Sequence, residues 1–573
     1  MAKCIYICSR ETLSPFTGRK LHDICERLSP DNITPHKPRV LVNKDIGYGI
    51  MNPTSTHSES STSLLMGQLF NKNDNWNVPL QEFPDGSYAL FRNGEEYCEI
   101  VSDPVASRTI WYYFDKDIFV ASTSQRAIVM YLGNFEFDER VIPWMLSTGT
   151  IGPGFSWDKR IKRVPADSSI ILEKKTWSVT TKSEPIEFSP VIRTDEQHET
   201  LLLESIRATF KSLSLDYSKW VLPLSGGYDS RGILCFLLDN NVDNQSLRTV
   251  TWGLKSSLEV KGNDAFVARE LASRINVTNT YYANDFSEES LDRIINRFVL
   301  NGEGLTDNVS DYLDGFKMWK TIFEDGIEGI IRGDEGFGCH QYLSSIVMRF
   351  NQSCITCSEI SNLKNYRKYG FSLQEIPQHL KQRKGETLSS WRDRLFHEHT
   401  LPTLFSALTD LKLAYIEQIN PLLSKKILQQ VRHLPDHLRT EKFLFKKIVD
   451  SLSPDIDYAT SASSASLSEI FKEKQMVAIL KNELSSNSAK SLFSADFLEF
   501  IRKGIKSKGK IKTPKTVSYS LISSLKKYVR RFLKNTFKGK FLSGIDPNVL
   551  AFRVLLICRM NKTLTEDKSC LYK

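Results

Sequence analysis

The stretch that decides the fold runs from Trp220 to Ser230 and reads Trp-Val-Leu-Pro-Leu-Ser-Gly-Gly-Tyr-Asp-Ser. Its first half, residues 220–224, is an apolar run that predicts a buried strand. The two glycines that follow carry no Cβ atoms and let the backbone approach an anion closely. Amide groups at the start of the helix expected next have no partner inside that helix and can bind phosphate oxygens. The stretch therefore predicts a phosphate-binding loop between a strand and a helix.

The polar side chains of this loop favour the same prediction. Ser225 and Ser230 supply hydroxyl donors. Asp229 would repel a phosphate unless it held a cation, so we predict that it is a Mg²⁺ ligand. The alternative is a tight strand-to-helix turn that Ser225 caps without any ligand. The complete pattern Ser-Gly-Gly-x-Asp-Ser after an apolar strand favours the phosphate site, and it differs from the phosphate loop that ends in Gly-Lys-Ser or Gly-Lys-Thr.

The sequence around the loop predicts a parallel sheet. Strand-like apolar runs at 220–224, 247–252 and 327–331 alternate with helical patterns at 230–238 and 264–275. Such alternation is typical of a parallel sheet with helices on its faces. A helix with one apolar face is predicted just before the first strand, from the spacing of apolar residues between 201 and 213, and mainly helical structure is expected beyond about residue 340.

A second acidic loop follows the last of these strands and contains Gly333, Asp334 and Glu335. Ligands of an open parallel sheet bind beyond the carboxyl ends of its strands, so Asp229 and Asp334 should emerge at the same edge. We therefore predict that these two carboxylates share a Mg²⁺–pyrophosphate. The alternative is that Asp334 only caps a following helix.

Residues 1 to about 185 read mostly as β-structure. Short apolar segments at 88–91, 109–113, 118–121 and 169–172 alternate with turn signals, among them Asp85-Gly86 and Asn93-Gly94. The polar residues 194–198 are predicted to be a linker. The expected α/β organisation has a β-rich part at 1–190, a part with the phosphate loop at 200–465, and a basic helical extension at 466–573.

The formal net charge of +9 is concentrated near the C-terminus, because residues 502–540 contain 14 Lys and Arg and no Asp or Glu. This asymmetry favours a local partner, and we predict no specific nucleic-acid partner. Apolar residues recur at helical spacing in 517–540, which predicts an amphipathic helix. Three roles stay open for it: contact with an anionic membrane surface, docking of an acidic partner, or packing on the body of the protein.

Composition narrows the class of protein further. No run reaches the roughly 18 apolar residues of a membrane span, and the N-terminal apolar run is too short for a secretory signal. We expect a cytoplasmic protein, with membrane contact at most peripheral through 502–540. Ten cysteines in 573 residues do not form a disulfide framework. Cys354 and Cys357 are expected to be reduced thiols, with structural zinc as the less favoured alternative because no second pair follows.

The Ser-Gly-Gly-x-Asp-Ser loop resembles that of the ATP pyrophosphatases, or PP-loop enzymes, which cleave ATP to AMP and pyrophosphate. Asparagine synthetases, NAD and GMP synthetases and tRNA thiolases share this loop. The order of a β-rich first part, this loop and a Gly-Asp-Glu loop is similar to the asparagine synthetase family. The resemblance covers about residues 75–460 and includes the following shorter matches: 85–91, 103–113, 121–122, 417–423, 434–435 and 439–447.

This resemblance implies both a fold and a reaction. The first part would be an N-terminal nucleophile hydrolase domain with αββα layers that releases ammonia from glutamine. The second would be a doubly wound PP-loop domain that uses ATP and Mg²⁺ to adenylate a carboxylate for attack by an amine. The catalytic residues implied are Asp229, Asp334, Glu335 and Lys442. The nucleotide contacts implied are Leu224, Ser225, Gly226, Gly227, Asp229, Ser230, Thr251 and Gly333, with Asp229 and Asp334 on the metal.

The sequence departs from the family at the glutaminase site. The family needs cysteine as the first residue of the mature chain, because the free α-amine of that residue serves as the base. Here Ala2 holds that position and Cys4 lies inside the chain. Met66 stands where the family has its glutamine-binding asparagine. Both differences resemble the glutaminase-dead branch that includes β-lactam synthetases and lasso-peptide cyclases, in which the attacking nitrogen is part of the substrate.

A second departure concerns a lysine that the family places after its last conserved proline to stabilise the adenylation transition state. The corresponding stretch here, 454–462, has no lysine. Lys442, Lys446 and Lys447 are the candidates to replace it.

Three functions follow as hypotheses. The favoured one is an amide-forming ligase without glutaminase activity, which joins a carboxylate substrate and an amine donor among small metabolites, peptides or sugar acids. The second is a glutamine-hydrolysing asparagine synthetase or a sugar-acid amidotransferase of polysaccharide synthesis, which the absence of an N-terminal cysteine disfavours. The third is a non-catalytic scaffold, which the acid inside the phosphate loop disfavours because a silent protein has no physical need for it.

Overall fold

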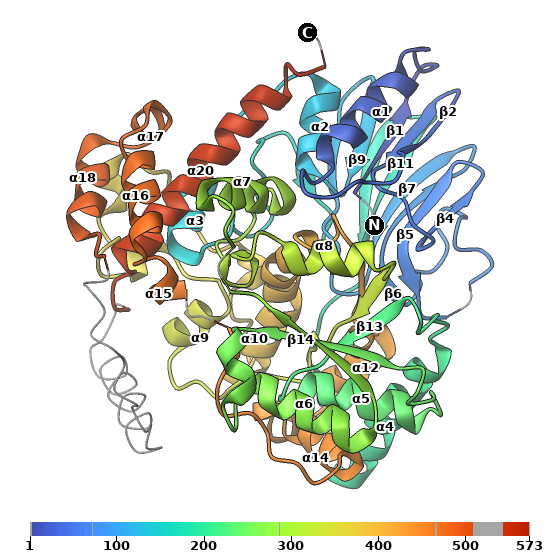
Figure 1. Ribbon diagram of the computed structural model, residues 1–573. Helices are drawn as coiled ribbons and strands as arrows, with labels where there is room; N and C mark the ends of the chain where they lie inside the picture. Colours follow the sequence, from blue (N-terminus) through green and yellow to red (C-terminus); the bar gives the residue numbers. More distant parts are fainter. Residues whose placement is uncertain (1–2, 72, 286, 465–466, 508–541, 572–573) are drawn as a thin grey trace.

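The computed structural model describes residues 3–71, 73–285, 287–464, 467–507 and 542–571. Over these ranges the chain forms two antiparallel sheets from its N-terminal third, a parallel sheet from its middle and a helical region toward its C-terminus (Figure 1). The predicted α/β fold with these kinds of region is confirmed. The domain boundaries proposed from the sequence stay predictions, and the amphipathic helix predicted at 517–540 lies outside the described residues.

The first two sheets each have six strands, and every neighbouring pair in them is antiparallel. The first sheet has the order β10 (Lys162–Arg163), β8 (Trp111–Phe114), β9 (Ile118–Ser122), β1 (Cys4–Ser9), β3 (Ile46–Ile50), β2 (Arg39–Asn43). The second has the order β12 (Ser178–Ser183), β11 (Ser168–Glu173), β7 (Tyr97–Ser102), β6 (Gly86–Asn93), β5 (Ser63–Leu69), β4 (His57–Ser60).

These two sheets pack face to face because side chains alternate along each strand. In β1, Tyr6 and its neighbours at even positions enter the core between the sheets, whereas Ile5 and Ile7 face the helices on the outer side. Those helices are α1 (Thr17–Leu28) and α2 (Gln125–Leu132), and α3 (Val141–Thr148) follows them in the chain. The N-terminal region is therefore layered as helices, first sheet and second sheet.

The parallel sheet has the order β15 (Thr278–Ala283), β14 (Arg248–Gly253), β13 (Trp220–Pro223), β16 (Gly329–Ile331), β17 (Glu417–Ile419). All of its strand pairs are parallel. Side chains alternate along these strands too, so each strand contributes to two hydrophobic cores. Val221 and Ile330 face one core, whereas Leu222 and Ile331 face the other. Helices cover both faces, so this sheet is doubly wound.

The helices around the parallel sheet fall into two groups. One group shares the core of Leu222 and consists of α4 (Asp195–Ser212), α5 (Tyr228–Asp239), α6 (Asp264–Ile275), α12 (Lys425–His433), α13 (Asp436–Arg439) and α14 (Phe443–Leu452). The other group shares the core of Val221 and includes α7 (Leu291–Gly302), α8 (Lys317–Glu324) and α11 (Ser406–Asp410). The remaining helices of the middle region are α9 (Ser345–Asn351), α10 (Leu388–Leu395) and a π-helix (Phe396–Phe405) that contains Pro402.

The C-terminal helices gather around one long helix. This helix, α20 (Pro547–Asp567), runs from the cluster at the left of Figure 1 to α2 of the N-terminal region. The cluster consists of α15 (Leu467–Ile470), α16 (Lys474–Glu483), α17 (Asn487–Leu492) and α18 (Ala495–Gly504). Buried Asp567 near its end accepts hydrogen bonds from Arg126 and Arg27, which fixes α20 to α2 and α1.

One local prediction was wrong. Residues 194–198 are not a linker, because Thr194 and Gln197 form a reciprocal capping box that starts α4 at Asp195. Asp85, which was expected in a turn, lies in a bend just before Gly86 opens β6, and its carboxylate accepts hydrogen bonds from Ser424 and from the backbone of Lys425. In both places a polar side chain forms a hydrogen bond with the backbone at the start of a helix. Sequence composition alone predicts a loop at such positions.

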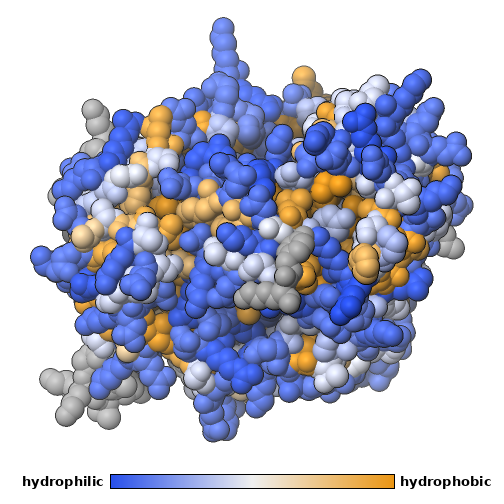
Figure 2. Space-filling model, turned by 90° about the horizontal axis from the view of Figure 1, so that it is seen from above, coloured by the Kyte–Doolittle hydropathy of each residue, from blue (hydrophilic) through white to orange (hydrophobic). Residues whose placement is uncertain are grey.

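On the face seen from above, hydrophilic and apolar regions alternate (Figure 2). Hydrophilic side chains cover most of this face, and apolar side chains gather in separate patches between them. Among the described residues, no helix is long and apolar enough to cross a membrane. Cys354 and Cys357 are buried free thiols. In the described parts of the chain, no group of three or more potential metal ligands includes either of them. Among the described residues, no third ligand that would favour structural zinc is therefore found beside these two cysteines.

Candidate functional site

The loop quoted from the sequence leaves β13 at the point where the strand order of the parallel sheet reverses. β13 pairs with β14 on one side and with β16 on the other, and it precedes both in the chain. Open α/β sheets bind ligands in the crevice that such a reversal creates beyond the strand ends. The loops after β13 and β16 both lie at this reversal. Asp229 and Asp334 consequently line the same cavity.

Ser225 and Ser230 tie the loop to the first turn of α5. Their hydroxyl oxygens lie 2.8 Å apart, and the Ser225 amide donates to Ser230 Oγ over 2.9 Å. The Gly227 amide donates to Ser225 Oγ over 3.2 Å. Gly227 is the N-cap of α5, and no side chain caps the helix. Ser225 therefore stiffens the turn and does not cap α5, contrary to the alternative interpretation, and the first helical amides stay available to a ligand.

The two glycines of the loop have different surroundings. A Cβ atom on Gly226 would lie 2.6 Å from Ala459 Cβ and 2.9 Å from Val267 Cβ, so the protein itself occupies that space. The Gly226 amide is also engaged, because it donates to Asp264 Oδ1 over 2.7 Å. A Cβ on Gly227 would meet only Ser225 Oγ, at 3.4 Å. Gly226 thus serves internal packing, and Gly227 is the glycine with open space around it.

A segment that we name the strap, residues 456–464, lies over this loop. Its backbone is joined to three other segments by hydrogen bonds: Ala459 N to Gly226 O at 3.0 Å, Asp264 N to Ser461 O at 2.9 Å, and Leu254 N to Ser463 O at 2.9 Å. Ala462, Ser463 and Ser464 of the strap line the cavity. The strap overlaps the stretch 454–462, in which the sequence lacks the family lysine, and it brings small side chains to the cavity.

Aromatic and guanidinium contacts hold the strap at its N-terminal end. The Tyr458 ring stacks on Tyr228 with a centroid separation of 3.7 Å and an interplanar angle of 17°. The Arg231 guanidinium lies 3.8 Å from the Tyr458 ring centroid and donates to Ile456 O at 2.7 Å and Asp457 O at 3.0 Å. Tyr228 and Arg231 both belong to α5, so the helix that starts at the loop also positions the strap.

The second loop packs directly against the first. The Arg332 amide donates to Ile419 O over 2.8 Å, which extends the pairing of β16 with β17 by one residue. At Gly333 a Cβ atom would lie 3.2 Å from Asp229 Cβ and 3.2 Å from Ser230 N. A Cβ atom here would require the start of α5 to shift by a few tenths of an ångström, so glycine favours this close approach, which brings the following two acids beside α5.

The cavity between these loops has a volume of about 410 Å³, which is within the size range of small-molecule sites. The predicted site residues that line it are Leu224, Ser225, Asp229, Ser230, Thr251, Gly333, Asp334, Glu335 and Lys442. Gly226 and Gly227 are the two predicted contacts that are not part of the lining. Thr251 is further tied to the loop, because its hydroxyl donates to Leu224 O over 2.8 Å.

The lining also contains polar residues that sequence reasoning missed: Asp264, Asp311, Arg332, Ser463 and Ser464. Two of them carry a signal in the sequence. Asp264 begins the helix after β14, and Arg332 immediately precedes the Gly-Asp-Glu loop, so both follow strands whose carboxyl ends point to the site. Asp311 and the strap serines come from segments without strand or helix periodicity, and no local pattern marks them.

Lys442 is the lysine that reaches the cavity. Its Nζ lies 2.9 Å and 3.0 Å from the two carboxylate oxygens of Asp229 and 2.8 Å from Glu335 Oε1. Lys447 instead pairs with Glu199 at 2.6 Å, and Lys446 lies 5.3 Å from the ring centroid of Tyr228. Of the three lysines considered from the sequence, the fold thus brings Lys442 between two acids of the site.

Lys442 and the two acids around it shift one another's pKa values, as seen for Glu335 and for Lys442 itself. Burial raises the pKa of Glu335, and the Lys442 ammonium partly offsets that rise, while Asp229 adds to it. Burial alone would lower the pKa of Lys442, but Glu335 and Asp229 together raise it well above its usual value. Lys442 therefore stays cationic throughout the physiological range, which suits a group that faces anionic ligands.

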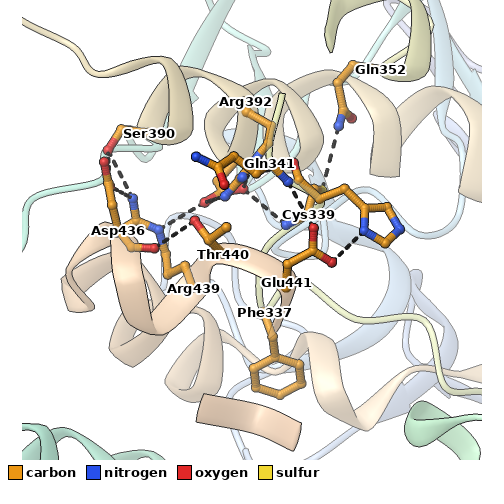
Figure 3. A network of polar contacts seen from close by, with 12 residues as sticks. Phe337, Cys339, Gln341, Gln352, Ser390, Arg392, Asp436, Arg439, Thr440 and Glu441 are labelled. Atoms are coloured by element: carbon orange, nitrogen blue, oxygen red, sulfur yellow. Dashed lines mark hydrogen bonds and ion pairs between the residues drawn. The ribbon is translucent and has the colours of Figure 1, made fainter. Parts of the chain in front are cut away.

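The backbone that presents Lys442 is in the left-handed region over two residues, with φ of 60° at Glu441 and 58° at Lys442. Non-glycine residues adopt this region at a cost of order 1 kcal/mol each, and only where the surroundings impose it. Here they do (Figure 3): Glu441 accepts from His340 Nδ1 at 2.6 Å and from the Gln341 amide at 3.1 Å, and its own amide donates to Cys339 O at 3.0 Å.

The same network is anchored by a buried arginine. The Arg439 guanidinium donates to Asp393 Oδ2 over 2.9 Å and also pairs with Asp436 (Figure 3). Asp393 in turn binds Arg392, and its Oδ1 accepts from the Cys339 amide over 3.3 Å. The segment after the Gly-Asp-Glu loop and the segment before Lys442 are therefore locked together, which fixes the lysine relative to Glu335.

Asp229, Glu335 and Asp334 are already paired with cationic or amide groups, whereas Asp311 has a buried Oδ1 without a hydrogen-bond partner in the part of the chain that the structure describes. Asp334 accepts from Arg332 Nη2 at 3.3 Å and from Gln418 Nε2 at 3.2 Å. In the described residues, the ligand atoms of Asp229, Asp334 and Glu335 are not all within 4.8 Å of one another, so these acids do not form a complete metal-ligand set by themselves. A divalent cation would need further oxygen ligands from a bound molecule, which is the usual situation for Mg²⁺ with phosphates.

A buried lysine, Lys412, interacts electrostatically with Arg332, Asp334 and Asp311 of the cavity. Lys412 is 4% exposed, and its Nζ donates to Leu408 O over 2.6 Å. Burial lowers the pKa of Lys412 to about 7, and Arg332 lowers it further, whereas Asp334, Asp311 and Asp410 act in the opposite direction. Burial raises the pKa of Asp410 to about 6. Lys412 and Asp410 thus both have pKa values near neutral pH, and Asp410 affects the pKa of Lys412 electrostatically.

The N-terminal sheet does not expose Cys4. Cys4 lies within β1 and is 1% exposed, and its backbone amide donates to Thr123 Oγ1 over 2.9 Å. Burial raises the pKa of the Cys4 thiol to about 12. The preceding residue is fixed as well, since Lys3 Nζ lies 2.8 Å from Glu303 Oε1. Met66 is buried in the core between the two antiparallel sheets.

Comparisons with known proteins give little beyond this geometry. No family model matches the chain, and no curated protein matches it. One similar solved structure is glutamine phosphoribosylpyrophosphate amidotransferase from B. subtilis complexed with ADP and GMP, at 11% identity over 50% of this chain and 67% of that chain, with a TM-score of 0.20. Another is the U34-tRNA thiolase NcsA from Methanococcus maripaludis, at 14% identity over 57% and 87%, with a TM-score of 0.23.

A third similar structure is described as the allosteric regulatory enzyme of purine biosynthesis, at 12% identity over 62% of this chain and 79% of that chain, with a TM-score of 0.20. These scores are too low to support an argument about fold or function.

Proposed function

We propose that this protein is an ATP-dependent amide-forming ligase, which adenylates a carboxylate, releases pyrophosphate and lets an amine displace AMP. The observation that carries the proposal is the position of Lys442 between Asp229 and Glu335 in a cavity bordered by the uncapped start of α5. A helix start with free amides binds phosphate, and a fixed ammonium beside it stabilises charge that develops on a leaving pyrophosphate.

The proposed reaction has two displacements. A carboxylate oxygen of the substrate attacks the α-phosphorus of ATP, the bond from that phosphorus to the bridging oxygen breaks, and pyrophosphate leaves. The amine then attacks the acyl carbon, the bond from that carbon to the phosphate oxygen breaks, AMP leaves, and the amine nitrogen loses a proton. Both steps depend on placing the reactants and on balancing charge, which a fixed polar cavity can supply.

The chain offers a distinct group for each part of the bound reactants. Lys442 and the first amides of α5 are proposed to hold the pyrophosphate portion of ATP. Arg332 is proposed to hold the substrate carboxylate, because its guanidinium lines the cavity and its Nε is buried without a hydrogen-bond partner among the described residues. An unpaired buried N–H is costly, and a planar guanidinium matches a carboxylate well.

The donor set also fits Mg²⁺. Asp229 and Asp334 bring carboxylates from two loops to one cavity, and Mg²⁺ in nucleotide sites commonly takes one or two carboxylates together with phosphate oxygens. When bound, the ion would neutralise charge on the pyrophosphate portion of ATP. That Asp229 and Glu335 already hold the Lys442 ammonium supports the view that this part of the cavity is built for cations.

The amine is proposed to come from the substrate or from solution and not from glutamine. The buried Cys4, whose nitrogen is a peptide amide and whose pKa is raised to about 12, supports this. An active N-terminal nucleophile needs both a free α-amine and an accessible thiol.

The proposal is tested by measuring pyrophosphate release from ATP and Mg²⁺ with a panel of carboxylates, and by identifying the nucleotide product. AMP and pyrophosphate are expected with a true substrate, whereas ADP and phosphate as products would contradict the proposal. Asp229→Ala should abolish turnover and leave the thermal unfolding midpoint nearly unchanged, because the Asp229 side chain is 36% exposed and holds no core contact. Turnover by Asp229→Ala at the wild-type rate would exclude the assigned site.

A further inference from the structure

A second cavity, which we name the side cavity, has a volume of about 530 Å³ and lies apart from the site described above. It is formed where the edge of the first antiparallel sheet meets the π-helix (Phe396–Phe405). Its lining from the N-terminal region consists of Pro153, Gly154, residues 163–166, Ser168 and residues 183–186, and its lining from the middle region consists of His379, Leu380, Arg383, Glu398, His399, Pro402 and Thr403. The two cavities share no lining residue. They border the same π-helix, since Phe405 lines the first and Pro402 lines the second.

Arg163 in this cavity is partly buried and lacks the ionic partner that Arg92, Arg392 and Arg394 have. It comes from β10, the edge strand, and its Nη2 donates to Ser406 Oγ over 3.0 Å. Its Nε is buried without a hydrogen-bond partner, and among the described residues no carboxylate lies within 4.0 Å of its guanidinium. Arg92, Arg392 and Arg394, by contrast, each form an ion pair with an acid.

The surroundings of Arg163 disfavour its charged form. Burial lowers the pKa of Arg163 to about 10, against the opposing influence of Asp410. Asp410 is itself buried, with its pKa raised to about 6, so it compensates the arginine incompletely. His399, which lines the cavity, has its pKa lowered to about 4 by burial and by Arg163, and is therefore neutral at pH 7. A buried charge without a close partner is destabilising unless a bound group supplies the counter-charge.

The acids that line the side cavity do not supply that counter-charge. Glu398 is engaged by Arg394 Nη1 at 2.8 Å, and Glu184 lies at the exposed rim. The rest of the wall is largely apolar and includes Val164, Pro165, Pro185, Ile186, Leu380 and Pro402. The cavity thus combines one uncompensated guanidinium with apolar walls, which is the usual composition of a site for a small organic anion.

We infer that the side cavity is a binding site for a monocarboxylate with an apolar body. The carboxylate pairs with the end of the Arg163 guanidinium formed by Nη1 and Nη2, because Nη1 donates no hydrogen bond among the described residues and Nη2 keeps a second proton besides the one that it gives to Ser406. The apolar body lies against the proline and aliphatic walls. Arg383 also lines the cavity, but its guanidinium lies 3.7 Å from Glu187. One guanidinium without an acidic partner, beside a neutral histidine, matches one negative charge better than the two of a phosphate monoester. This inference does not depend on the proposed ligase function.

The test compares hexanoate with its neutral analogue hexanamide by isothermal titration calorimetry on the full chain. Wild type should bind hexanoate at least roughly tenfold more tightly than hexanamide, because a charge-assisted pair replaces a neutral hydrogen bond. Arg163→Met should lose this preference and bind both equally weakly. Arg163→Met should also have an unchanged or higher thermal unfolding midpoint, because it removes an uncompensated charge.

Two further variants make the result decisive. Arg163→Lys keeps the charge but not the planar fork, so it should retain part of the preference for hexanoate. Arg332→Gln, which changes the first cavity, should bind hexanoate as wild type does. The inference is overturned if wild type does not discriminate hexanoate from hexanamide, if Arg163→Met discriminates as well as wild type, or if Arg332→Gln is the variant that loses binding.

Discussion

The ammonium of Lys442 lies 2.9 Å from Asp229 Oδ1 and 3.0 Å from Asp229 Oδ2, which joins the end of one loop to the start of the helix that defines the site. Because Glu335 holds the same ammonium at 2.8 Å, the lysine is fixed between two loops that follow adjacent parallel strands. The arrangement presets a cation at the point where phosphate oxygens would meet the start of α5.

Replacing this lysine should therefore remove most of the activity. Lys442→Gln is expected to lower kcat/KM for pyrophosphate release by about 100-fold or more, the usual loss when one fixed charge-stabilising donor is removed. Lys447→Gln is the matched control, because Lys447 lies in α14, which begins directly after Lys442, and pairs with Glu199 at 2.6 Å on the surface. Steady-state kinetics on both variants decide the matter. Equal loss in both would mean that the effect comes from the helix and not from the site.

The two loop glycines should respond differently to alanine. Gly226→Ala places a methyl group 2.6 Å from Ala459 Cβ, so the strap must shift, at a cost of about 1–3 kcal/mol for such overpacking. Gly227→Ala meets only Ser225 Oγ at 3.4 Å and should keep the wild-type thermal midpoint while it weakens pyrophosphate binding. The double variant Gly226→Ala with Ala459→Gly should recover part of the lost stability. Equal midpoints for both single variants would contradict this packing argument.

The parts of the fold that the sequence predicts correctly are those with a local cause. The helix over 264–275 was expected from its apolar spacing, and α6 spans Asp264–Ile275, with Asn263 capping its start and Asn276 in the left-handed conformation at its end. The strand before Ser225 is likewise local, because an apolar run between polar segments is buried whatever its partners are.

The parts that the sequence could not provide depend on contacts between distant residues. Nothing in residues 456–464 signals a strap, since its order comes from Arg231, Tyr228 and the backbone of Gly226. The choice of Lys442 over its neighbours depends on the left-handed backbone at Glu441, which a network from another loop imposes. The prediction at Thr194 was wrong for a different reason. The polar composition of 194–198 predicted a linker, although Thr194 forms the capping box that starts α4.

The strap should loosen when its anchor on α5 is removed. Arg231→Met deletes the donors to Ile456 O and Asp457 O and the guanidinium over Tyr458. Amides in 456–464 should then exchange with deuterium at least about tenfold faster, corresponding to a local stability loss of roughly 1.4 kcal/mol or more. Arg207→Met is the control, because Arg207 pairs with Asp239 on the surface. Unchanged exchange in Arg231→Met would show that backbone hydrogen bonds alone hold the strap.

Cys4 should be chemically silent. Because burial raises the pKa of its thiol to about 12, almost none of it is thiolate at pH 7.5, and alkylation of the native protein by iodoacetamide should leave Cys4 unmodified in peptide mass spectra. Incubation with glutamine should release no glutamate, and Cys4→Ala should keep the wild-type rate of pyrophosphate release. Glutamate release that Cys4→Ala abolishes would overturn the proposal that the amine does not come from glutamine.

Lys412 should make stability depend on pH in the alkaline range. Its folded-state pKa of about 7 lies below its ordinary value of 10.5, so between these limits the unfolded chain binds more protons than the folded one. The free energy of unfolding should consequently rise with pH in this window, by up to about 1.4 kcal/mol per pH unit from this group. Below pH 7 the group is charged in both states, and its unfavourable burial is then at its full size.

Lys412→Met removes this contribution. The variant should unfold at a higher temperature than wild type near pH 7, and the difference should shrink as the pH approaches 10, because wild type then carries a neutral amine there. Lys562→Met is the control, since Lys562 is 72% exposed and its i,i+4 contact with Glu566 is 3.9 Å long. Thermal midpoints of the three proteins, measured at intervals across this range, provide the test. A Lys412→Met curve parallel to that of wild type would mean that Lys412 keeps its proton in the fold, and that the acids around it, Asp334, Asp311 and Asp410, outweigh its burial.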